Sequence, residues 1–171
     1  MNSSPSGIEV HSHDWDEGDV TQILTFTLND EEYGVDILQV NTIREWEPIT
    51  SLPDTPDYIK GVLNVFDSIV PIIDLRLRFG LPQVEYTTTT VVILLNVHYQ
   101  DKNLVIGIVV DSVSDTYTIK PENIKQKPQV GEHIKVNYLK GLIDIDDSLI
   151  LLLDSSKILS EQQLAQVSDI D

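Results

Sequence analysis

The chain of 171 residues has no cysteine, one methionine, few aromatic residues (6%) and few basic side chains. The lack of cysteine excludes disulfide bonds, thiolate metal ligands and thiol catalysis. Eleven Lys and Arg stand against 28 Asp and Glu, which gives a formal net charge of −17 at pH 7. Nucleic-acid binding needs clustered Lys and Arg, so this charge argues against it and favours partners with basic surfaces.

Long apolar runs are missing as well. The chain has no window of about twenty apolar residues, so we expect no direct insertion into a membrane. The N-terminal stretch MNSSPSGIEVHSHDWDEGD is polar and acidic and has no apolar signal segment. We therefore expect a cytoplasmic protein, and the chain length predicts one compact unit with a sizeable core.

The chain contains a duplicated segment. The stretch Tyr58–Phe79, YIKGVLNVFDSIVPIIDLRLRF, aligns without a gap with Tyr138–Leu159, YLKGLIDIDDSLILLLDSSKIL. This spacing is too long for a solenoid unit and indicates a duplicated subdomain, with one copy in each half of the molecule. The alternative is that two unrelated hairpins share a generic pattern.

Both copies predict the same order of elements. Each has a glycine that permits a sharp bend, a short β-type run, a turn pair, an apolar strand and an acidic helix cap. These are Gly61, Val62–Val65, Asp67-Ser68, Ile69–Ile73 and Asp74 in the first copy, and Gly141, Leu142–Ile145, Asp147-Ser148, Leu149–Leu153 and Asp154 in the second. Each copy therefore predicts a hairpin followed by a helical turn.

The remaining segments predict further strands and two tails. Residues 1–21 are rich in Ser, Asp, Glu and Gly, which predicts a disordered acidic tail. The three-residue spacing of Ile37, Val40 and Ile43 predicts a short helix from Asp36 to about Glu45. A helix and a tail are expected at 160–171.

Strands at short spacing predict the fold class. Between residues 22 and 159, strand patterns follow one another with turns between them, which favours two similar antiparallel β-barrels that share one core over α/β layers. We expect the two subdomains to divide near residues 80–90.

Catalytic groups are hard to find. The four histidines, His11, His13, His98 and His133, lie at scattered tail and loop positions. His11 and His13 form a weak chelating pair without fixed geometry, so we expect no metal site. There is no Gly-rich phosphate loop, HExxH or GxSxG motif, and no cofactor is implied. The sequence predicts a non-enzymatic protein that acts through its surfaces.

Several segments carry a family resemblance. They are DEEYGVDILQVNTIREW, ITSLPDTPDYIKG and GVLNVFDSIVPIIDLRLRFG in the first half, and GIVVDSVSDTYTI, NYLKGLI and LILLLD in the second. Together they resemble the CheW family of bacterial chemotaxis coupling proteins. The resemblance implies two intertwined SH3-like five-stranded antiparallel barrels with short helices. It also implies a cytoplasmic adaptor, recruited to membrane receptor arrays, that couples the cytoplasmic tips of chemoreceptors to the regulatory domain of a CheA-type histidine kinase.

The resemblance also implies two sets of site residues. The receptor-side set is Val40, Thr42, Gly61, Phe66 and Val91, and the kinase-side set is Tyr138, Gly141 and Leu142. The family usually has Asn-Leu-Arg-Gly where this chain has Asn64-Val65-Phe66-Asp67, and a glutamate where it has Thr42. These departures are consistent with altered partner choice or with neutral drift.

Two alternative functions stay open. One is a CheW-like adaptor of a parallel chemosensory or twitching-motility pathway. The other is a small-ligand-binding β-barrel, which predicts a preformed pocket.

Overall fold

The computed structural model describes residues 21–126 and 137–170. The predicted tail, apart from Thr21, lies outside these residues, as do His11, His13 and His133. The described elements, in chain order, are β1 (Thr21–Leu28), β2 (Glu31–Asp36), a 3-10 turn (Ile37–Gln39), β3 (Val40–Glu45), β4 (Ile59–Val65), β5 (Ser68–Asp74), α1 (Leu75–Arg78), β6 (Val91–Tyr99), β7 (Lys102–Val110), β8 (Ser112–Ile119), β9 (Ile124–Lys125), β10 (Leu139–Ile145), β11 (Ser148–Leu153) and α2 (Glu161–Ile170).

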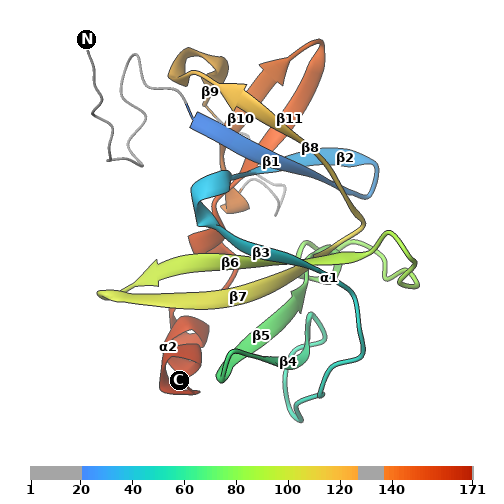
Figure 1. The fold of residues 1–171 in the computed structure, drawn as a ribbon, viewed down its shortest axis with the longest axis vertical. Coiled ribbons are helices and arrows are strands. Elements are labelled where there is room, and N and C mark those ends of the chain that lie inside the picture. The colour runs from blue at the N-terminus through green and yellow to red at the C-terminus, as the bar shows by residue number, and fades with distance from the viewer. Residues whose placement is uncertain (1–20, 127–136, 171) are drawn as a thin grey trace.

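The strands form two sheets. The first sheet has the order β8-β1-β2-β11-β10-β9 and the second has the order β3-β6-β7-β5-β4. Figure 1 shows the first sheet in the upper half of the molecule and the second below it. The predicted mostly-β fold with two related units is confirmed. The sheets are mixed rather than purely antiparallel, because β2 pairs with β11 and β5 pairs with β7 in parallel.

The two halves of the chain exchange strands. Strands β3, β4 and β5 join β6 and β7, whereas β8 to β11 join β1 and β2. Strands from both sides of residues 80–90 therefore enter each sheet. The two sheet orders match strand by strand, with β8, β1, β2, β11 and β10 corresponding to β3, β6, β7, β5 and β4. The short β9 is additional.

The duplicated hairpins have the same backbone geometry. Phe66 and Asp67 have φ of 50° and 67°, and Asp146 and Asp147 have φ of 51° and 64°. Positive φ at both central residues is typical of a type I′ hairpin turn. The turn pairs therefore lie one residue earlier than predicted. These equivalent turns favour duplication over two unrelated hairpins.

Close packing explains the glycine that opens each copy. A Cβ on Gly61, which has φ of +147°, would lie 2.0 Å from the Thr50 oxygen. A Cβ on Gly141 would lie 2.7 Å from the Lys125 oxygen. At each glycine the chain segment before the hairpin crosses close to the strand, which no side chain permits.

The predicted helix from Asp36 to Glu45 is wrong. The Asp36 carboxylate accepts a hydrogen bond from the Leu38 amide (2.9 Å) at the start of the 3-10 turn, and β3 follows. The register of β3 shifts between Val40 and Thr42. Such a β-bulge adds one residue, so residues three apart come to share a face of the strand. This produces the spacing that resembles a helix.

Other local predictions agree with the structure. The Asp74 carboxylate accepts a hydrogen bond from the Leu77 amide at the start of α1, and Asp154 accepts one from the Ser156 amide at a second 3-10 turn, Ser155–Lys157. Both predicted caps are confirmed. The helix α2 begins at Glu161, where the sequence predicts a helix.

Three apolar clusters fill the fold. The main core lies between the two sheets and takes side chains from both, including Phe26, Tyr33, Phe79 and Tyr138. The other clusters lie on the opposite face of each sheet: Val65, Val70, Ile72, Val92, Leu94 and Val109 in the second sheet, and Ile23, Ile119, Ile143, Ile150 and Leu152 in the first. Within the described residues, no helix has the length and apolar character needed to cross a membrane.

Candidate functional site

The margin of the main core is exposed to solvent along β3, the edge strand of the second sheet. Val40 and Ile43 lie opposite Leu95 and Ile93 of β6, which are buried in the main core. Directly opposed residues of an antiparallel pair project from the same face of the sheet. No described strand pairs with the other side of β3. Ile43 therefore retains 42% of its exposed area at the margin of the core.

Val91 extends this apolar margin. It lies opposite Glu45 on β3 and packs against the main core while remaining partly exposed. Val40, Ile43 and Val91 thus follow one face of the β3–β6 pair. Among the described residues, β3 and the segment directly after it form one ion pair, Arg44–Glu47 at 3.3 Å, and both side chains are exposed. Exposed pairs contribute little to stability or affinity, so apolar contact dominates this margin.

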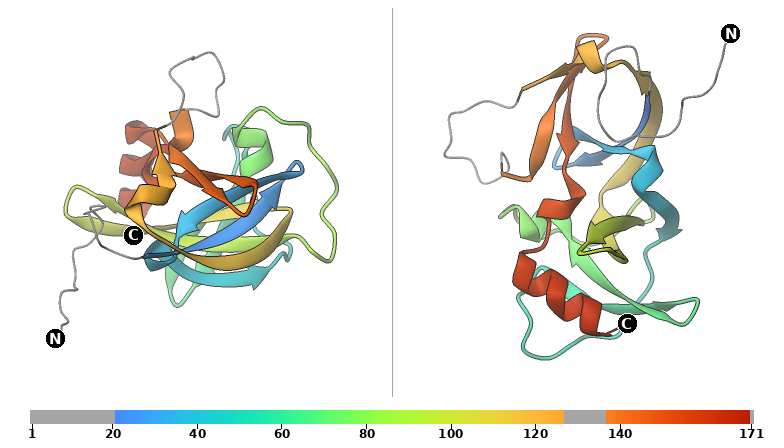
Figure 2. Two further views of the ribbon diagram at one scale, coloured as in Figure 1. Left: turned by 90° about the horizontal axis from the view of Figure 1, so that it is seen from above. Right: turned by 90° about the vertical axis from the view of Figure 1, so that its left-hand side faces the viewer.

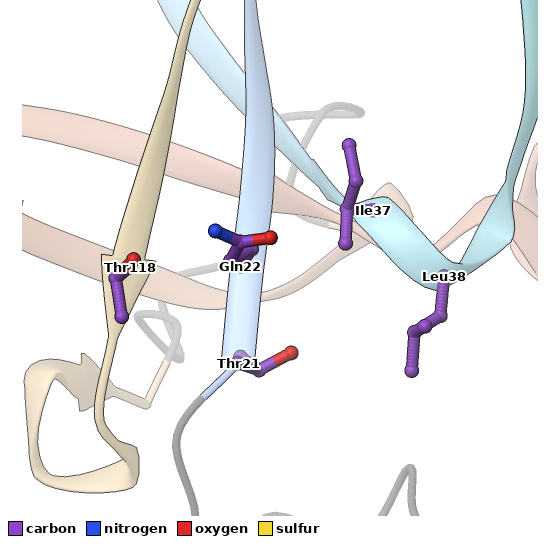
Figure 3. A pocket seen from close by; sticks show the side chains of 5 residues that line it. All are labelled: Thr21, Gln22, Ile37, Leu38 and Thr118. Carbon is purple, nitrogen blue, oxygen red and sulfur yellow. The ribbon is translucent and has the colours of Figure 1, made fainter.

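A shallow depression of about 400 Å³ lies where β1, β8 and the 3-10 turn meet. Figure 3 shows its lining, which is Thr21, Gln22, Ile37, Leu38 and Thr118.

Leu38 is 65% exposed, and the turn that carries it runs directly into Val40. We call Leu38, Val40, Ile43 and Val91 together the β3 surface.

The structure brings together some of the predicted receptor-side residues. Val40 and Val91 share the β3 surface. Thr42 lies opposite Leu94, which faces the cluster on the other side of the sheet, and Gly61 is buried against Thr50. Phe66 is 95% exposed at the β4–β5 turn, which lies away from β3 in Figures 1 and 2. The receptor role of these residues stays a prediction.

Sequence reasoning missed Leu38 and Ile43. Both belong to the segment predicted as a helix, in which Ile43 would have been one of the apolar positions facing the core. The β-bulge after Val40 and the position of β3 at the end of the sheet expose Ile43 instead. Recognition of the β-branched residues Val40, Thr42 and Ile43 as strand formers is the signal that favours the correct element.

The predicted kinase-side residues are mostly internal. The ring of Tyr138 lies 4.8 Å from that of Phe79 and is buried, and Gly141 is buried against Lys125. Only Leu142 is partly exposed. Tyr138 and Gly141 therefore shape the fold, and their role in kinase binding stays a prediction.

A polar network ties α1 to the β1–β2 turn. Arg76 donates two hydrogen bonds to the Asp111 carboxylate (2.9 and 3.0 Å), which also accepts one from the Asn29 amide (2.9 Å). Partial burial alone would raise the pKa of Asp111. The hydrogen bonds from Arg76 and Asn29, with the charge of Arg76, outweigh that effect and lower the pKa below its ordinary value. In the described part of the chain, no three His, Asp or Glu residues are placed to hold a metal ion.

Comparison with known proteins decides the family. A family model described as CheW-like domain matches residues 22–163. The chain belongs to the CheW family. It is 42% identical to the chemotaxis protein CheW of Klebsiella aerogenes over 149 residues, which is 87% of each chain. It is 32% identical to a probable chemotaxis protein CheW of Rhizobium etli over 142 residues, covering 83% of this chain and 89% of that one.

The fold of a solved CheW structure agrees. The crystal structure of the scaffolding protein TtCheW from Thermoanaerobacter tengcongensis matches with a TM-score of 0.70 and 28% identity, covering 78% of this chain and 88% of that one. The chain is thus a non-enzymatic chemotaxis adaptor of the CheW family. Its function rests on the surfaces that it presents to partners.

Proposed function

We propose that this chain couples the cytoplasmic tip of a chemoreceptor to the regulatory domain of a CheA-type histidine kinase. The receptor segment would lie along the β3 surface. The observation that carries this proposal is the exposure of Leu38 and Ile43 beside the margin of the main core along β3. Exposed apolar side chains at the edge of a packed core are suited to bury a partner's apolar residues.

The kinase would contact the second half of the chain. Leu142 is the predicted residue that remains accessible there, whereas buried Tyr138 and Gly141 would act by holding β10 in place. The adaptor would work in the cytoplasm and reach the membrane through its receptor.

A parallel signalling pathway remains the second candidate. Phe66 supports this second candidate, because its aromatic side chain is almost fully exposed at a position where the family usually has an arginine. Loss of this charge together with Thr42 would alter which receptor is bound. The small-ligand alternative receives less support, because the depression where β1, β8 and the 3-10 turn meet is shallow and open to solvent rather than enclosed.

Titration calorimetry tests the coupling function. The chain is titrated with a soluble receptor tip fragment, and separately with the regulatory domain of a CheA-type kinase from the same cell. We expect Ile43→Asp to weaken receptor binding at least about tenfold, the loss typical of a contact in the centre of an interface. Kinase binding should not change.

Val84→Asp is the matched control, because Val84 is 41% exposed and lies outside the β3 surface. It should bind both partners as the wild type does. Unchanged receptor affinity in Ile43→Asp would move the receptor site elsewhere. If the wild type binds neither partner at tens of micromolar, roughly where an interface of this kind is already visible, the coupling function is wrong.

A further inference from the structure

The two sheets differ in what covers them. Helix α2 packs against β5 and β7 of the second sheet, as Figure 1 shows at the lower end of the molecule. Leu164 and Val167 of α2 are buried in the main core, which β5 enters through Ile73. The Gln163 side-chain amide donates a hydrogen bond to the Tyr58 hydroxyl (2.6 Å), which fixes the helix in place. An amphipathic helix thus covers the core-facing side of β5.

Among the described residues, no helix covers the equivalent side of the first sheet in this way. Strand β11 corresponds to β5, and side chains on one face of a strand recur every second residue. On the core-facing side of β11, Leu153 is buried, Leu151 is partly buried and Leu149 is 55% exposed. Neither α1 nor α2 packs against β11 as α2 packs against β5. The core-facing side of β11 therefore becomes progressively more exposed to solvent from Leu153 to Leu149.

A neighbouring strand widens this face. Leu142 lies directly opposite Leu151 in the β10–β11 pair and is also partly exposed. We call Leu142, Leu149 and Leu151 the β11 strip. The β10–β11 hairpin that carries it lies at the end of the molecule away from the β4–β5 hairpin in Figure 1 and in the right-hand view of Figure 2.

Acidic side chains border the strip. Asp144 lies directly opposite Leu149, and Asp146 and Asp147 form the adjoining turn, all of them exposed. The equivalent hairpin has Asn64, Phe66 and Asp67 at these positions, and thus one carboxylate instead of three. A partner that covers the strip gains from positive charge near the turn, because opposite charges attract when brought together.

We propose that the β11 strip is a docking face for an amphipathic, basic helix of a partner protein. The helix presents two apolar residues three positions apart, as α2 presents Leu164 and Val167 to the equivalent face, and it carries Lys or Arg beside them. Residues at this spacing lie on one side of a helix. The strip includes Leu142, the accessible member of the predicted kinase side, so this docking face overlaps the proposed kinase contact and extends it along β11.

A designed helix provides the probe. A helix-stabilised peptide repeats residues 160–170 with Glu161→Lys and Asp169→Lys, so that it keeps the apolar pair of α2 and gains positive charge. Fluorescence anisotropy with the full chain should show saturable binding at about 10–500 µM, the range expected for a small apolar contact. High salt should weaken it, because salt screens the carboxylates.

Variants locate the bound peptide. Leu149→Asp should weaken binding at least about tenfold. A peptide that also carries Leu164→Ser and Val167→Ser should not bind. Leu38→Asp is the control variant of the chain, because it alters an equally apolar, exposed residue of the β3 surface, and it should bind the peptide as the wild type does. Circular dichroism checks that both variants fold.

Two outcomes would overturn the inference. One is the absence of binding up to about 1 mM, well above the affinity expected of a docking face. The other is equal affinity for the wild type and Leu149→Asp, which would mean that the peptide binds elsewhere. Both outcomes leave the proposed receptor binding untouched, because Leu149→Asp should still bind the receptor fragment. Conversely, failure of the wild type to bind receptor would leave the peptide result standing.

Discussion

Arg78 of the first repeat copy donates a hydrogen bond from its Nε to the main-chain oxygen of Ile158, its equivalent in the second copy. The same guanidinium lies over the rings of Tyr58 (4.6 Å) and Tyr138 (5.1 Å), which are themselves an equivalent pair. The two tyrosines that mark the start of each copy therefore bracket one cation. This contact joins the copies where their chain segments meet.

Removal of this cation should destabilise the fold. Arg78→Leu loses two cation–π contacts and leaves the Ile158 oxygen without its donor, so we expect a loss of about 1–3 kcal/mol in the free energy of unfolding. Urea unfolding at pH 7 measures it. Arg44→Leu is the control, because the exposed Arg44–Glu47 pair should contribute less than about 0.5 kcal/mol. Equal losses in the two variants would contradict a joining role for Arg78.

The β4–β5 turn contains a strained residue, Phe66, and a substitution that relieves the strain should stabilise the fold. Phe66 has φ of 50°, a conformation that Asn adopts readily and that costs a bulky residue about 1 kcal/mol. Phe66→Asn should therefore raise the free energy of unfolding by about 0.5–1 kcal/mol. Asp146→Asn, at the equivalent turn, should change it by less. A destabilised Phe66→Asn would show that the ring makes contacts that outweigh the strain.

The same substitution bears on partner choice. If Phe66 contacts the receptor, Phe66→Asn should lower receptor affinity while it raises stability, which is the pattern of a residue kept for function. Titration of the variant with the receptor tip fragment measures the affinity. Unchanged affinity would indicate neutral drift at this turn.

Local features of the fold could be predicted from the sequence. The helix caps Asp74 and Asp154 and the duplicated hairpins follow from residues close together in the chain, and the structure contains them. No local pattern predicts the exchange of strands between the halves, because β3 meets β6, and β8 meets β1, through non-local pairing. Only the family resemblance, which implies intertwined barrels, indicated it. The helix predicted over β3 failed for a related reason: one bulge changed which residues share a face.

The candidate site was predicted only in part for the same reason. Val40 and Val91 come together because β3 pairs with β6. The family resemblance had placed both residues in the receptor-side set without indicating this pairing. Gly61 and Tyr138 are buried, so their place in a motif reflects packing. The exposure of Leu38, Ile43 and Leu149 depends on where each sheet ends and on where α2 folds back. No local sequence pattern predicts the edge of a sheet or the position at which α2 packs.

The two glycines that open the repeat copies, Gly61 and Gly141, should differ in their tolerance of a side chain. Gly61→Ala places a Cβ 2.0 Å from a main-chain oxygen at a φ that other residues rarely adopt, whereas Gly141→Ala meets an oxygen at 2.7 Å without that φ. We expect Gly61→Ala to cost more than about 3 kcal/mol, and Gly141→Ala about 1–3 kcal/mol. Thermal unfolding ranks them. The reverse order would mean that the Thr50 segment moves freely.

The Arg76–Asp111 pair should make stability depend on pH. Because the pKa of Asp111 is lowered in the fold, its contribution is complete above the unfolded pKa of about 4 and is lost as the pH falls through the lower folded value. Asp111→Asn should therefore cost about 1–2 kcal/mol at pH 7, a figure reduced for solvent screening. The difference between variant and wild type should shrink at acidic pH, below about 4.

Denaturant unfolding at pH 7, 5 and 3 measures this difference. Asp115→Asn on β8 is the control, because its carboxylate is exposed, accepts one long hydrogen bond from the Thr116 amide (3.3 Å) and forms no ion pair within residues 21–126 and 137–170, so its effect should stay small. A loss in Asp111→Asn that persists undiminished at pH 3 would mean that the carboxylate acts through shape rather than charge. In that case the Asn29 amide, rather than Arg76, would be the partner that ties the β1–β2 turn to Asp111.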